Sequence, residues 1–399
     1  MLMKEHILRE AESLLPEIVE IRRHIHQHPE LSYAEYETAA FISSKLDTMG
    51  IEHRTGIAGT GIVGFIRGEA AGRGLTIGLR ADMDALPISE AGASEYHSRN
   101  EGVMHACGHD AHVAMLIGAA GIIKSLRKEF AGTVLLVFQP GEEKAPGGAR
   151  MMIETGIFRN FNPDMLIAQH ILPDMQSGTV GFHAGPYLAS CDEIYITVAG
   201  RGGHAAQPSQ YTDQIYIASE LVISLKDTVA EKSKGQAATI LGIGKITGMG
   251  ATNVIPEKVE IACTFRTFDE RWRKEAKEII RKTASEIARK RGVSIDVNIV
   301  EGYPVLVNNE PLTNRAVELS RQLLGEAKVK EVPDRMSSED FSFFAEKYPS
   351  FLFRLGITSD GEKMRPAHTP YFDMDESSMA TGTATMAWLA LNLIKALRG

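Results

Sequence analysis

The stretch that decides the fold class is 133–138 (TVLLVF), which runs directly into 139–143 (QPGEE). An unbroken run of apolar and β-branched residues is typical of a strand buried on both faces of a parallel sheet. Two adjacent carboxylates, Glu142 and Glu143, follow at its carboxyl end. Binding sites in sheets of this kind form at the carboxyl ends of the strands. The stretch therefore predicts both a buried parallel strand and a candidate site beside it.

Three other segments have the same layout, an apolar strand followed by ionisable side chains. They are 75–79, which leads to Asp82 and Asp84, then 164–169, which leads to His170, and 351–356, which leads to the loop with His368. Helical patterns at 110–128, 147–156 and 311–325 lie between these strands. The alternation predicts an α/β domain with a mainly parallel sheet flanked by helices. The side chains expected to converge on one cleft are Asp84, Cys107, His109, Glu142, Glu143, His170 and His368.

The richest group of candidate metal ligands is the segment 105–112, HACGHDAH. Thiolate and neutral imidazole are the side chains that zinc and similar divalent metals bind best. Cys107 and His109 share one face only in extended or loop backbone, so we expect them just before a helix, with Asp110 as its N-cap. Small residues at 118–121 indicate that this helix packs closely against a neighbour. Taken singly, each residue fits a helix cap with buried histidines and an inert cysteine, but the cluster favours a metal site.

Length and composition limit the classes of protein to which the chain can belong. With 399 residues, two domains are expected. A net charge of −8 without any basic run gives no electrostatic footprint for nucleic acid. No apolar stretch is long enough to span a bilayer, and the first residues lack the apolar segment of a secretory signal. We therefore expect a cytoplasmic protein, with no nucleic-acid or membrane partner, whose three cysteines remain thiols.

Two further motifs are interpreted as structural. Gly59–Gly64 (GTGIVG) matches a dinucleotide-binding fingerprint, but the segment after it leaves no room for the helix that this fingerprint requires. We expect two strands joined by a glycine-rich hairpin, which argues against a nicotinamide dehydrogenase. His24, His26 and His28 look like a metal-binding tract, although the following Pro-Glu fits a capped turn, and we favour the structural interpretation.

A different pattern occupies residues 187–303 and predicts a second domain. Strands are expected at 191–199, 238–247, 258–268 and 293–300, and helices at 211–230 and 270–291. The order strand-helix-strand-strand-helix-strand is that of a ferredoxin-like α+β unit. It would be inserted into the first domain, which comprises 1–186 and 304–399. An exposed edge strand would let a second copy pair here, so we expect a lid and dimerisation domain.

The insert carries its own polar cluster, 200–208 (GRGGHAAQP), directly after its first strand. These glycines are compatible with a flexible turn, but His204 on a mobile lid would also stabilise a developing oxyanion. Both interpretations stay open from the residues alone. Asn253 and Arg266 are weaker candidates for substrate binding, because by default they are a turn and a strand residue.

Amide hydrolysis is a reaction to which these residue types are suited. A metal pair polarises the carbonyl and lowers the pKa of a bound water from about 15.7 towards about 7. A carboxylate that is not itself a ligand must then carry the proton to the leaving amine. Of Glu142 and Glu143, one can bind metal while the other carries this proton, provided that the loop twists at Pro140–Gly141.

The motifs, in their order along the chain, resemble those of the aminoacylase/carboxypeptidase metallopeptidases. Within them, the chain looks like the amidohydrolase subfamily that acts on N-acyl-amino acids, hippurate and indoleacetyl-amino acids. The resemblance runs from Arg22 nearly to the C-terminus and rests on HACGHD (105–110), QPGEE (139–143), GH (203–204), TNVIP (252–256), SEDF (338–341) and HTP (368–370). Gly141 and Lys144–Pro146 depart from the pattern, which has an alanine and a run of glycines there.

The resemblance implies a pair of divalent metal ions and a homodimer joined through the inserted domain. The ions would be held by Cys107, His109, Glu143, His170 and His368, with Cys107 as the bridge. Zinc, manganese, cobalt or nickel would each suit such ligands. Asp84 would orient a ligand histidine rather than bind metal.

The same resemblance implies the catalytic roles. Glu142 would be the general base, His204 from the lid of the partner subunit would polarise the scissile carbonyl, and Asn253 would help to hold the substrate carboxylate. The expected activity is metal-dependent hydrolysis of N-acyl-L-amino acids. A metallo-carboxypeptidase or dipeptidase acting on short peptides would use the same residues and stays an alternative. A non-catalytic metal-binding protein would explain Cys107 and His109 but not a spare carboxylate at Glu142.

Overall fold

A computed structural model describes residues 3–92 and 94–396, which form two compact units. The larger unit comprises the described residues up to Gly185, Val307–Pro333 and those from Asp340 onward, and the smaller one comprises Pro186–Leu306 and Asp334–Glu339. The expected insert, 187–303, omits this last segment. Backbone bonds explain the difference: the amide of Ala189 donates to the carbonyl of Arg335 (3.1 Å), whose own amide donates to the carbonyl of Tyr187 (2.9 Å).

The larger unit is built on an eight-stranded sheet with the order β1-β2-β4-β3-β5-β16-β6-β15. Its central strands β4 (Thr133–Gln139), β3 (Thr76–Asp82), β5 (Met165–Gln176) and β16 (Ser350–Thr358) are parallel neighbours. They are the four segments expected from the sequence, so the mainly parallel α/β sheet is confirmed. The outer strands are β1 (Glu52–Ile57), β2 (Gly61–Arg67), β6 (Val180–Phe182) and β15 (Val329–Glu331). β1 and β2 form the antiparallel hairpin expected at the glycine-rich motif.

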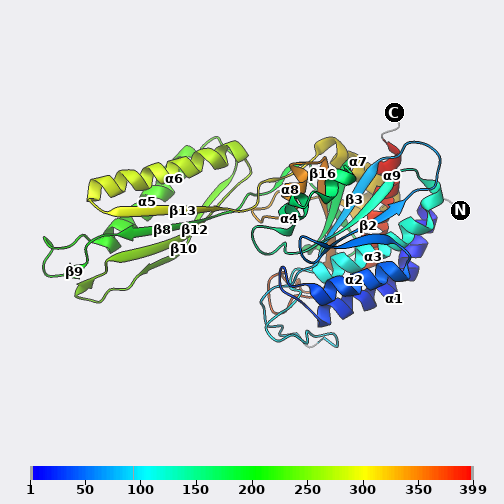
Figure 1. Cartoon of the computed structure of the whole chain (residues 1–399), viewed down its shortest axis with the longest axis horizontal. Helices are drawn as coiled ribbons and strands as arrows, with labels where there is room; N and C mark the ends of the chain where they lie inside the picture. Colours follow the sequence, from blue (N-terminus) through cyan, green and yellow to red (C-terminus); the bar gives the residue numbers. More distant parts are fainter. Residues whose placement is uncertain (1–2, 93, 397–399) are drawn as a thin grey trace. The chain divides into compact units, whose positions relative to one another are not determined.

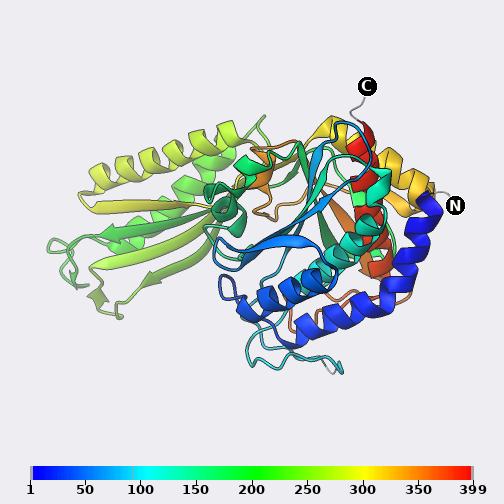
Figure 2. The ribbon, with the colours of Figure 1, turned by 45° about the vertical axis from the view of Figure 1, so that its right-hand side comes forward.

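Helices cover both faces of this sheet (Figures 1 and 2). On one face α1 (Met3–Gln27), α3 (His109–Ser125), α7 (Glu310–Leu324) and α9 (Ser378–Ala396) pack together, with α2 (Tyr36–Thr48) beside α3. On the other face α4 (Gly148–Glu154) and α8 (Ser342–Ala345) pack against β4 and β16. Single turns of 3-10 helix lie at Arg127–Glu129, Ile157–Asn160 and Glu326–Lys328. No helix within the described residues is both long and apolar enough to cross a bilayer.

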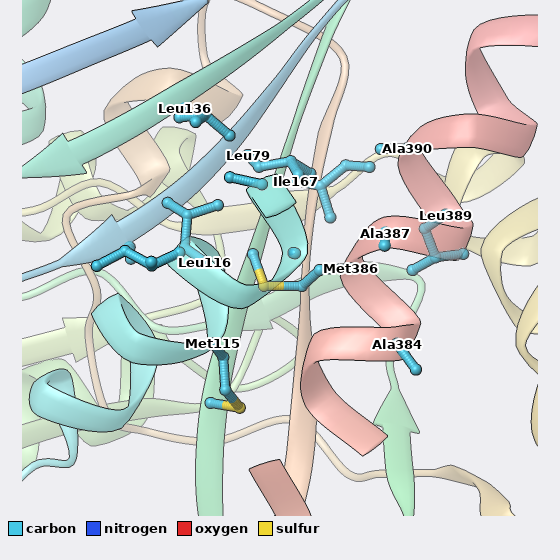
Figure 3. Close-up of a cluster of buried hydrophobic side chains, with 14 of the residues drawn as sticks. Leu79, Met115, Leu116, Leu136, Ile167, Ala384, Met386, Ala387, Leu389 and Ala390 are labelled. Carbon is cyan, nitrogen blue, oxygen red and sulfur yellow. The ribbon is translucent and has the colours of Figure 1, made fainter. Parts of the chain in front are cut away.

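The core between the sheet and α3 is made of side chains from alternate residues of the central strands and from helices that pack closely together. Figure 3 shows Leu79, Leu136 and Ile167 of the central strands on the side where α3 and α9 lie. Full burial of a side chain of this size contributes about 1.5–3 kcal/mol. A Cβ at Gly118 would lie 2.8 Å from Ile18 of α1, so this glycine allows the close helix packing expected at 118–121.

The start of α3 differs from the sequence-based expectation. The helix begins at His109, and Gly108 precedes it in the left-handed conformation (φ 82°), with no side chain capping the helix. Glycine adopts this conformation without the steric cost that a Cβ brings. The prediction of Asp110 as N-cap is therefore wrong. Its carboxylate is buried in the first turn and instead accepts hydrogen bonds from Arg22 and His26.

The smaller unit has the order of elements predicted for the insert. Its antiparallel sheet, β10-β12-β8-β13, consists of β8 (Asp192–Ala199), β10 (Thr239–Gly248), β12 (Lys258–Thr267) and β13 (Ser294–Glu301). α5 (Gln214–Lys232) and α6 (Glu270–Arg291) lie side by side on one face (Figure 1). Two short ladders complete the structure, β9 (Gly203–His204) with β11 (Val254–Ile255), and β7 (Gly185–Leu188) with β14 (Leu306–Asn308).

Candidate metal centre

The structure brings the predicted metal ligands together in the larger unit. The Sγ atom of Cys107 lies 3.6 Å from Nε2 of His170 and 3.3 Å from Nε2 of His368. The Oε1 atom of Glu143 lies 3.2 Å from Nε2 of His368 and 3.9 Å from Nε2 of His109. The described residues form five compact groups of possible ligands, and two of these groups share Cys107. One is Cys107, His109 and His170, and the other is Cys107, Glu143 and His368.

Each imidazole in the first group turns its Nε2 atom towards the cluster. Nδ1 of His109 lies 2.8 Å from the backbone oxygen of Asp84, and Nδ1 of His170 lies 2.8 Å from that of Ile171. Each Nδ1 therefore carries a proton and donates it, so that in the neutral ring the Nε2 lone pair is available to a metal ion. Nε2 of His109 is buried and has no hydrogen-bond partner among the described residues. A divalent metal ion would satisfy this atom.

The protonation equilibria of the cluster fit a cation bound between these groups. Burial raises the pKa of the Cys107 thiol, and the carboxylate of Glu143 raises it further. Hydrogen bonds to Cys107 and Glu143 raise the pKa of His368 to about 10. Burial and the charge of Arg354 lower the pKa of His170 well below its usual value, so this imidazole is neutral. Burial lowers the pKa of His109, but Asp82 and Cys107 outweigh this effect and raise it well above its usual value. Because ligands bind metal in their deprotonated form, a divalent cation would displace the protons of Cys107, His109 and His368.

Exposure differs across the cluster and indicates where a substrate would reach it. The side chain of His109 is fully buried, whereas that of His368 is 53% exposed and that of Glu143 is 12% exposed. His368 also has a left-handed backbone (φ 60°), which is uncommon for a residue with a Cβ. The group that contains His368 is thus the accessible side of the candidate centre.

Asp82, His109 and His112 form another possible group of metal ligands, but Asp82 and His112 are already engaged in hydrogen bonds within the protein. Nδ1 of His112 lies 2.6 Å from Oδ1 of Asp82, and Nε2 of His112 accepts the amide hydrogen of Ile171 (3.0 Å). The second oxygen of Asp82 accepts a hydrogen bond from the buried guanidinium of Arg80 (2.6 Å). With both ring nitrogens engaged, His112 has no lone pair left for a metal ion.

Asp84 organises the loop that carries the two adjacent glutamates. Its carboxylate accepts the amide hydrogens of Glu142 and Glu143, both at 3.0 Å, and the hydroxyl hydrogen of Ser32 at 2.6 Å. Burial alone would raise the pKa of Asp84, but these bonds and the neighbouring His109 lower it overall, so the group is a carboxylate. Asp84 thereby twists the backbone so that successive side chains reach the same site.

Glu142 is the second carboxylate beside the cluster. Its side chain is buried, and its Oε1 accepts the amide hydrogen of Asp340 at 3.4 Å. The carboxylate of Asp340 is in turn held by Arg80 (3.0 Å), Gln139 (2.8 Å) and the amide of Ala149 (2.9 Å). The support for Glu142 therefore comes from a buried network that the sequence analysis did not assign, although Asp340 belongs to the motif SEDF.

Segment 32–35 supports the same loop from another side and was also missed. Oε1 of the buried Glu35 accepts the amide hydrogen of Gly141 (2.8 Å), and the hydroxyl of Tyr33 bonds the carbonyl of Lys144 and the amide of Gly147. A Cβ at Gly141, where φ is 57°, would lie 2.1 Å from the Tyr33 ring. The only available sequence signal was the departure from the family pattern at Gly141.

The histidine tract of α1 has the structural role that we favoured. His24 stacks on Phe41, and Nδ1 of His28 bonds the carbonyl oxygen of His24. His26 is buried, with Nδ1 2.8 Å from Asp110 and Nε2 3.4 Å from Glu90. Burial lowers the pKa of His26, but Asp110 and Glu90 outweigh this effect and raise it to about 9.

Folding stability should therefore depend on pH through His26. An unfolded chain would titrate this group near pH 6.5, so its contribution is complete below about pH 6.5 and is lost as the pH rises through about 9. We expect His26→Gln to destabilise the protein by about 3 kcal/mol more at pH 6.5 than above pH 9, measured by urea unfolding. His28→Gln is the control. Parallel pH curves for wild type and His26→Gln would contradict the prediction. The ionisable groups that face His26 are Arg22, Glu90, Tyr96, His105 and Asp110.

The remaining predicted site residues lie in the smaller unit. His204 pairs with Val254 across the β9–β11 ladder, and the amide of Ala205 donates to the carbonyl of Asn253 (3.0 Å), so His204 and Asn253 are neighbours. The amide of Ala206 donates to Nδ1 of His204 (3.1 Å), which leaves the proton of a neutral imidazole on the exposed Nε2. Arg266 lies elsewhere, on β12, and donates to the carbonyl of Met336 (2.8 Å).

Comparison with known proteins agrees with this geometry. The model of "Peptidase family M20/M25/M40" matches residues 78–392. An IAA-amino acid hydrolase ILR1-like protein of Arabidopsis thaliana is 37% identical over 95% of this chain and 85% of its own length. A thermostable carboxypeptidase of Saccharolobus solfataricus is 36% identical over 94% of both chains. A solved Bacillus subtilis structure, described as a dinuclear metal-binding peptidase, covers 97% of this chain and 100% of its own, with 30% identity and a TM-score of 0.83. These findings make the protein a metal-dependent hydrolase with amidohydrolase and peptidase relatives, and the chain belongs to peptidase family M20/M25/M40.

Proposed function

We propose that the protein hydrolyses the amide bond of N-acyl-L-amino acids, with Glu142 as the general base. The observation that carries this proposal is the arrangement of two adjacent glutamates around one carboxylate. Asp84 holds both backbone amides, so that Glu143 reaches the ligand cluster while Glu142 is held against the amide of Asp340. A ligand carboxylate beside a non-ligand carboxylate is what metal-assisted hydrolysis requires.

Two divalent ions would be held in the two groups that share Cys107. His109 and His170 would complete the more buried group, and Glu143 and His368 the accessible one. Thiolate, imidazole and carboxylate together suit zinc, manganese, cobalt or nickel. Asp84 would position these ligands from outside, through the bond from His109 to its backbone oxygen and through the amide of Glu143. A reducing compartment such as the cytosol would keep Cys107 a thiol.

The protein's own residues would handle the proton and the developing charge. The bound ions supply the Lewis acidity that polarises the amide carbonyl and acidifies the attacking water. Glu142 would take the proton of that water and deliver it to the nitrogen of the leaving amine. The Nε2–H of His204 would donate to the carbonyl oxygen as negative charge develops there. Asn253, the neighbour of His204, would help to hold the carboxylate of the substrate, and Arg266 on β12 is a separate candidate for substrate binding.

We further propose a homodimer joined through the smaller unit, in which each His204 serves the other subunit. Strand β10 is an edge of its sheet and therefore has unpaired backbone groups for another strand. Exposed apolar side chains on β10 and α5 support this surface as the interface, and they are Ile215, Ile223, Ile240 and Ile246. A twofold interface would use the same surface on both copies.

The test is release of free amino acid from N-acetyl, N-benzoyl and indoleacetyl amino acids and from dipeptides. Chelator-stripped protein would receive zinc, manganese, cobalt or nickel singly, with Glu142→Gln protein as the blank for contaminating activity. We expect metal-restored cleavage in which kcat/KM for one acyl class exceeds that for dipeptides by about tenfold or more. The reverse preference would favour the carboxypeptidase alternative. Two bound ions with no turnover of any substrate would leave a metal-binding protein.

A further inference from the structure

Arg22 of α1 is a buried cation that no proposed catalytic step uses. Its side chain has no exposed surface, and its guanidinium contacts three carboxylates. Nε donates to Asp110 (3.0 Å), Nη1 to Glu376 (2.8 Å) and Nη2 to Asp373 (3.1 Å). Arginine is rarely buried to this extent unless it is paired. Because the planar guanidinium has fixed donor directions, it also fixes the relative positions of the carboxylates that it binds.

These carboxylates belong to the segments that carry two of the three members of the accessible ligand group, Cys107 and His368. Asp110 lies in the first turn of α3 and follows Cys107 and His109. Asp373 and Glu376 lie between His368 and the start of α9. Arg22 therefore links, through one guanidinium, the segment that bears Cys107 to the segment that bears His368, although these segments are more than 250 positions apart in sequence.

The backbone conformation of His368 explains why this link is needed. A left-handed conformation costs free energy in a residue with a Cβ, so the surrounding structure must hold it in place. On one side the amide of His368 donates to the carbonyl of Ala106 (2.8 Å), next to Cys107. On the other side this segment is tied by the carbonyl of Pro370, which accepts the amide hydrogen of Ala91 (2.8 Å), and then by the bonds from Arg22 to Asp373 and Glu376.

We propose that Arg22 is a positioning residue that sets the separation of Cys107 and His368 and so tunes the metal affinity of the accessible ligand group. This inference rests on the proposed metal centre, but not on the identity of the substrate. Loss of Arg22 would loosen the segment after His368, which would keep the bonds from Arg23 to Glu376 and from Tyr96 to Asp373 near the start of α9. His109 and His170 would stay oriented by their Nδ1 bonds to backbone oxygens and by their positions on α3 and β5. The effect would therefore fall on one of the two bound ions.

The test is a titration of the stripped protein with Co²⁺, followed by absorbance, with metal content measured in parallel. For Arg22→Met we expect one of the two equivalents to bind about 10- to 100-fold more weakly and the other to be unchanged. Arg22→Lys keeps the charge but not the planar fork, and should lie in between. Arg23→Met is the matched control, because Arg23 also binds Glu376 and stacks on Tyr96 but does not contact Asp110.

A double variant identifies the ligand group that is affected. His368→Asn removes a ligand of the accessible group, so combining it with Arg22→Met should cause no further loss of affinity. If Arg22→Met does not fold, Asp373→Asn removes the negative charge of one partner of Arg22 and should give a smaller selective loss. A folded Arg22 variant that binds both ions like wild type, or that weakens both equally, would overturn the inference. Since the readout is binding, lack of turnover on every substrate would count against the proposed reaction and not against Arg22.

Discussion

Glu142→Gln is expected to lower kcat by about 10³- to 10⁴-fold while both metal ions stay bound. The substitution preserves size, and the amide oxygen of glutamine can still accept the hydrogen bond from Asp340. Glutamine cannot take a proton, so the contribution of general base catalysis is lost, which corresponds to about 4–5.5 kcal/mol in activation free energy. The measurements are kcat on the best substrate of the panel and metal content per chain.

The neighbouring glutamate provides the contrast. Glu143→Gln should lower metal content first, because Glu143 belongs to the ligand group of Cys107 and His368. Adding excess metal should restore part of the activity of Glu143→Gln but none of that of Glu142→Gln. Activity of Glu142→Gln within about tenfold of wild type would show that Glu142 is not the general base. Loss of metal from Glu142→Gln would instead show that Glu142 is a metal ligand.

His204→Ala should reduce kcat by about 10²- to 10³-fold with unchanged metal content, since one oxyanion donor is lost. The amide of Ala206 leaves the Nε2 proton of His204 available for this bond. His204→Gln keeps a donor of shorter reach and serves as the partial replacement. A normal rate in His204→Ala would exclude the proposed role of the lid.

Mixed dimers separate action within a subunit from action across the interface. If His204 acts on the other subunit, a hybrid of Glu142→Gln and His204→Ala chains contains one intact site. Equal mixing should then recover about a quarter of wild-type activity, because half of the dimers are hybrids and each has one working site of two. Action within one subunit would leave every site defective, and the mixture would stay as inactive as its components.

Much of the fold was predictable because its signals are local. Four apolar strands with ionisable residues after them gave the parallel sheet, and the order of elements in the insert gave its α+β unit. The candidate ligands were also predictable, since parallel strands end at a common edge. His170 is a partial exception, because β5 continues past it to Gln176.

The rest depends on contacts between distant residues, which spacing does not reveal. Asp110 has the side chain of a good N-cap, but two buried cationic groups, Arg22 and His26, bind its carboxylate in the folded protein. The supports of Glu142 likewise come from segments about 200 residues away, at Asp340. The extra segment of the smaller unit, 334–339, joins it through backbone pairing near Tyr187 and through the bond from Arg266 to the carbonyl of Met336. None of these partners has a periodic or compositional signature.

The contact between Tyr33 and Gly141 couples these two positions in evolution and in protein engineering. A methyl group at position 141 and a tyrosine ring at position 33 need the same space. A chain with alanine at 141 must therefore have a smaller residue at 33, or a different path for one of the two loops. A change from the pair Tyr33 and Gly141 to a pair with alanine at 141 therefore has a preferred order. Residue 33 must become smaller before residue 141 gains a side chain. The reverse order passes through a variant in which the loop of the proposed base is displaced.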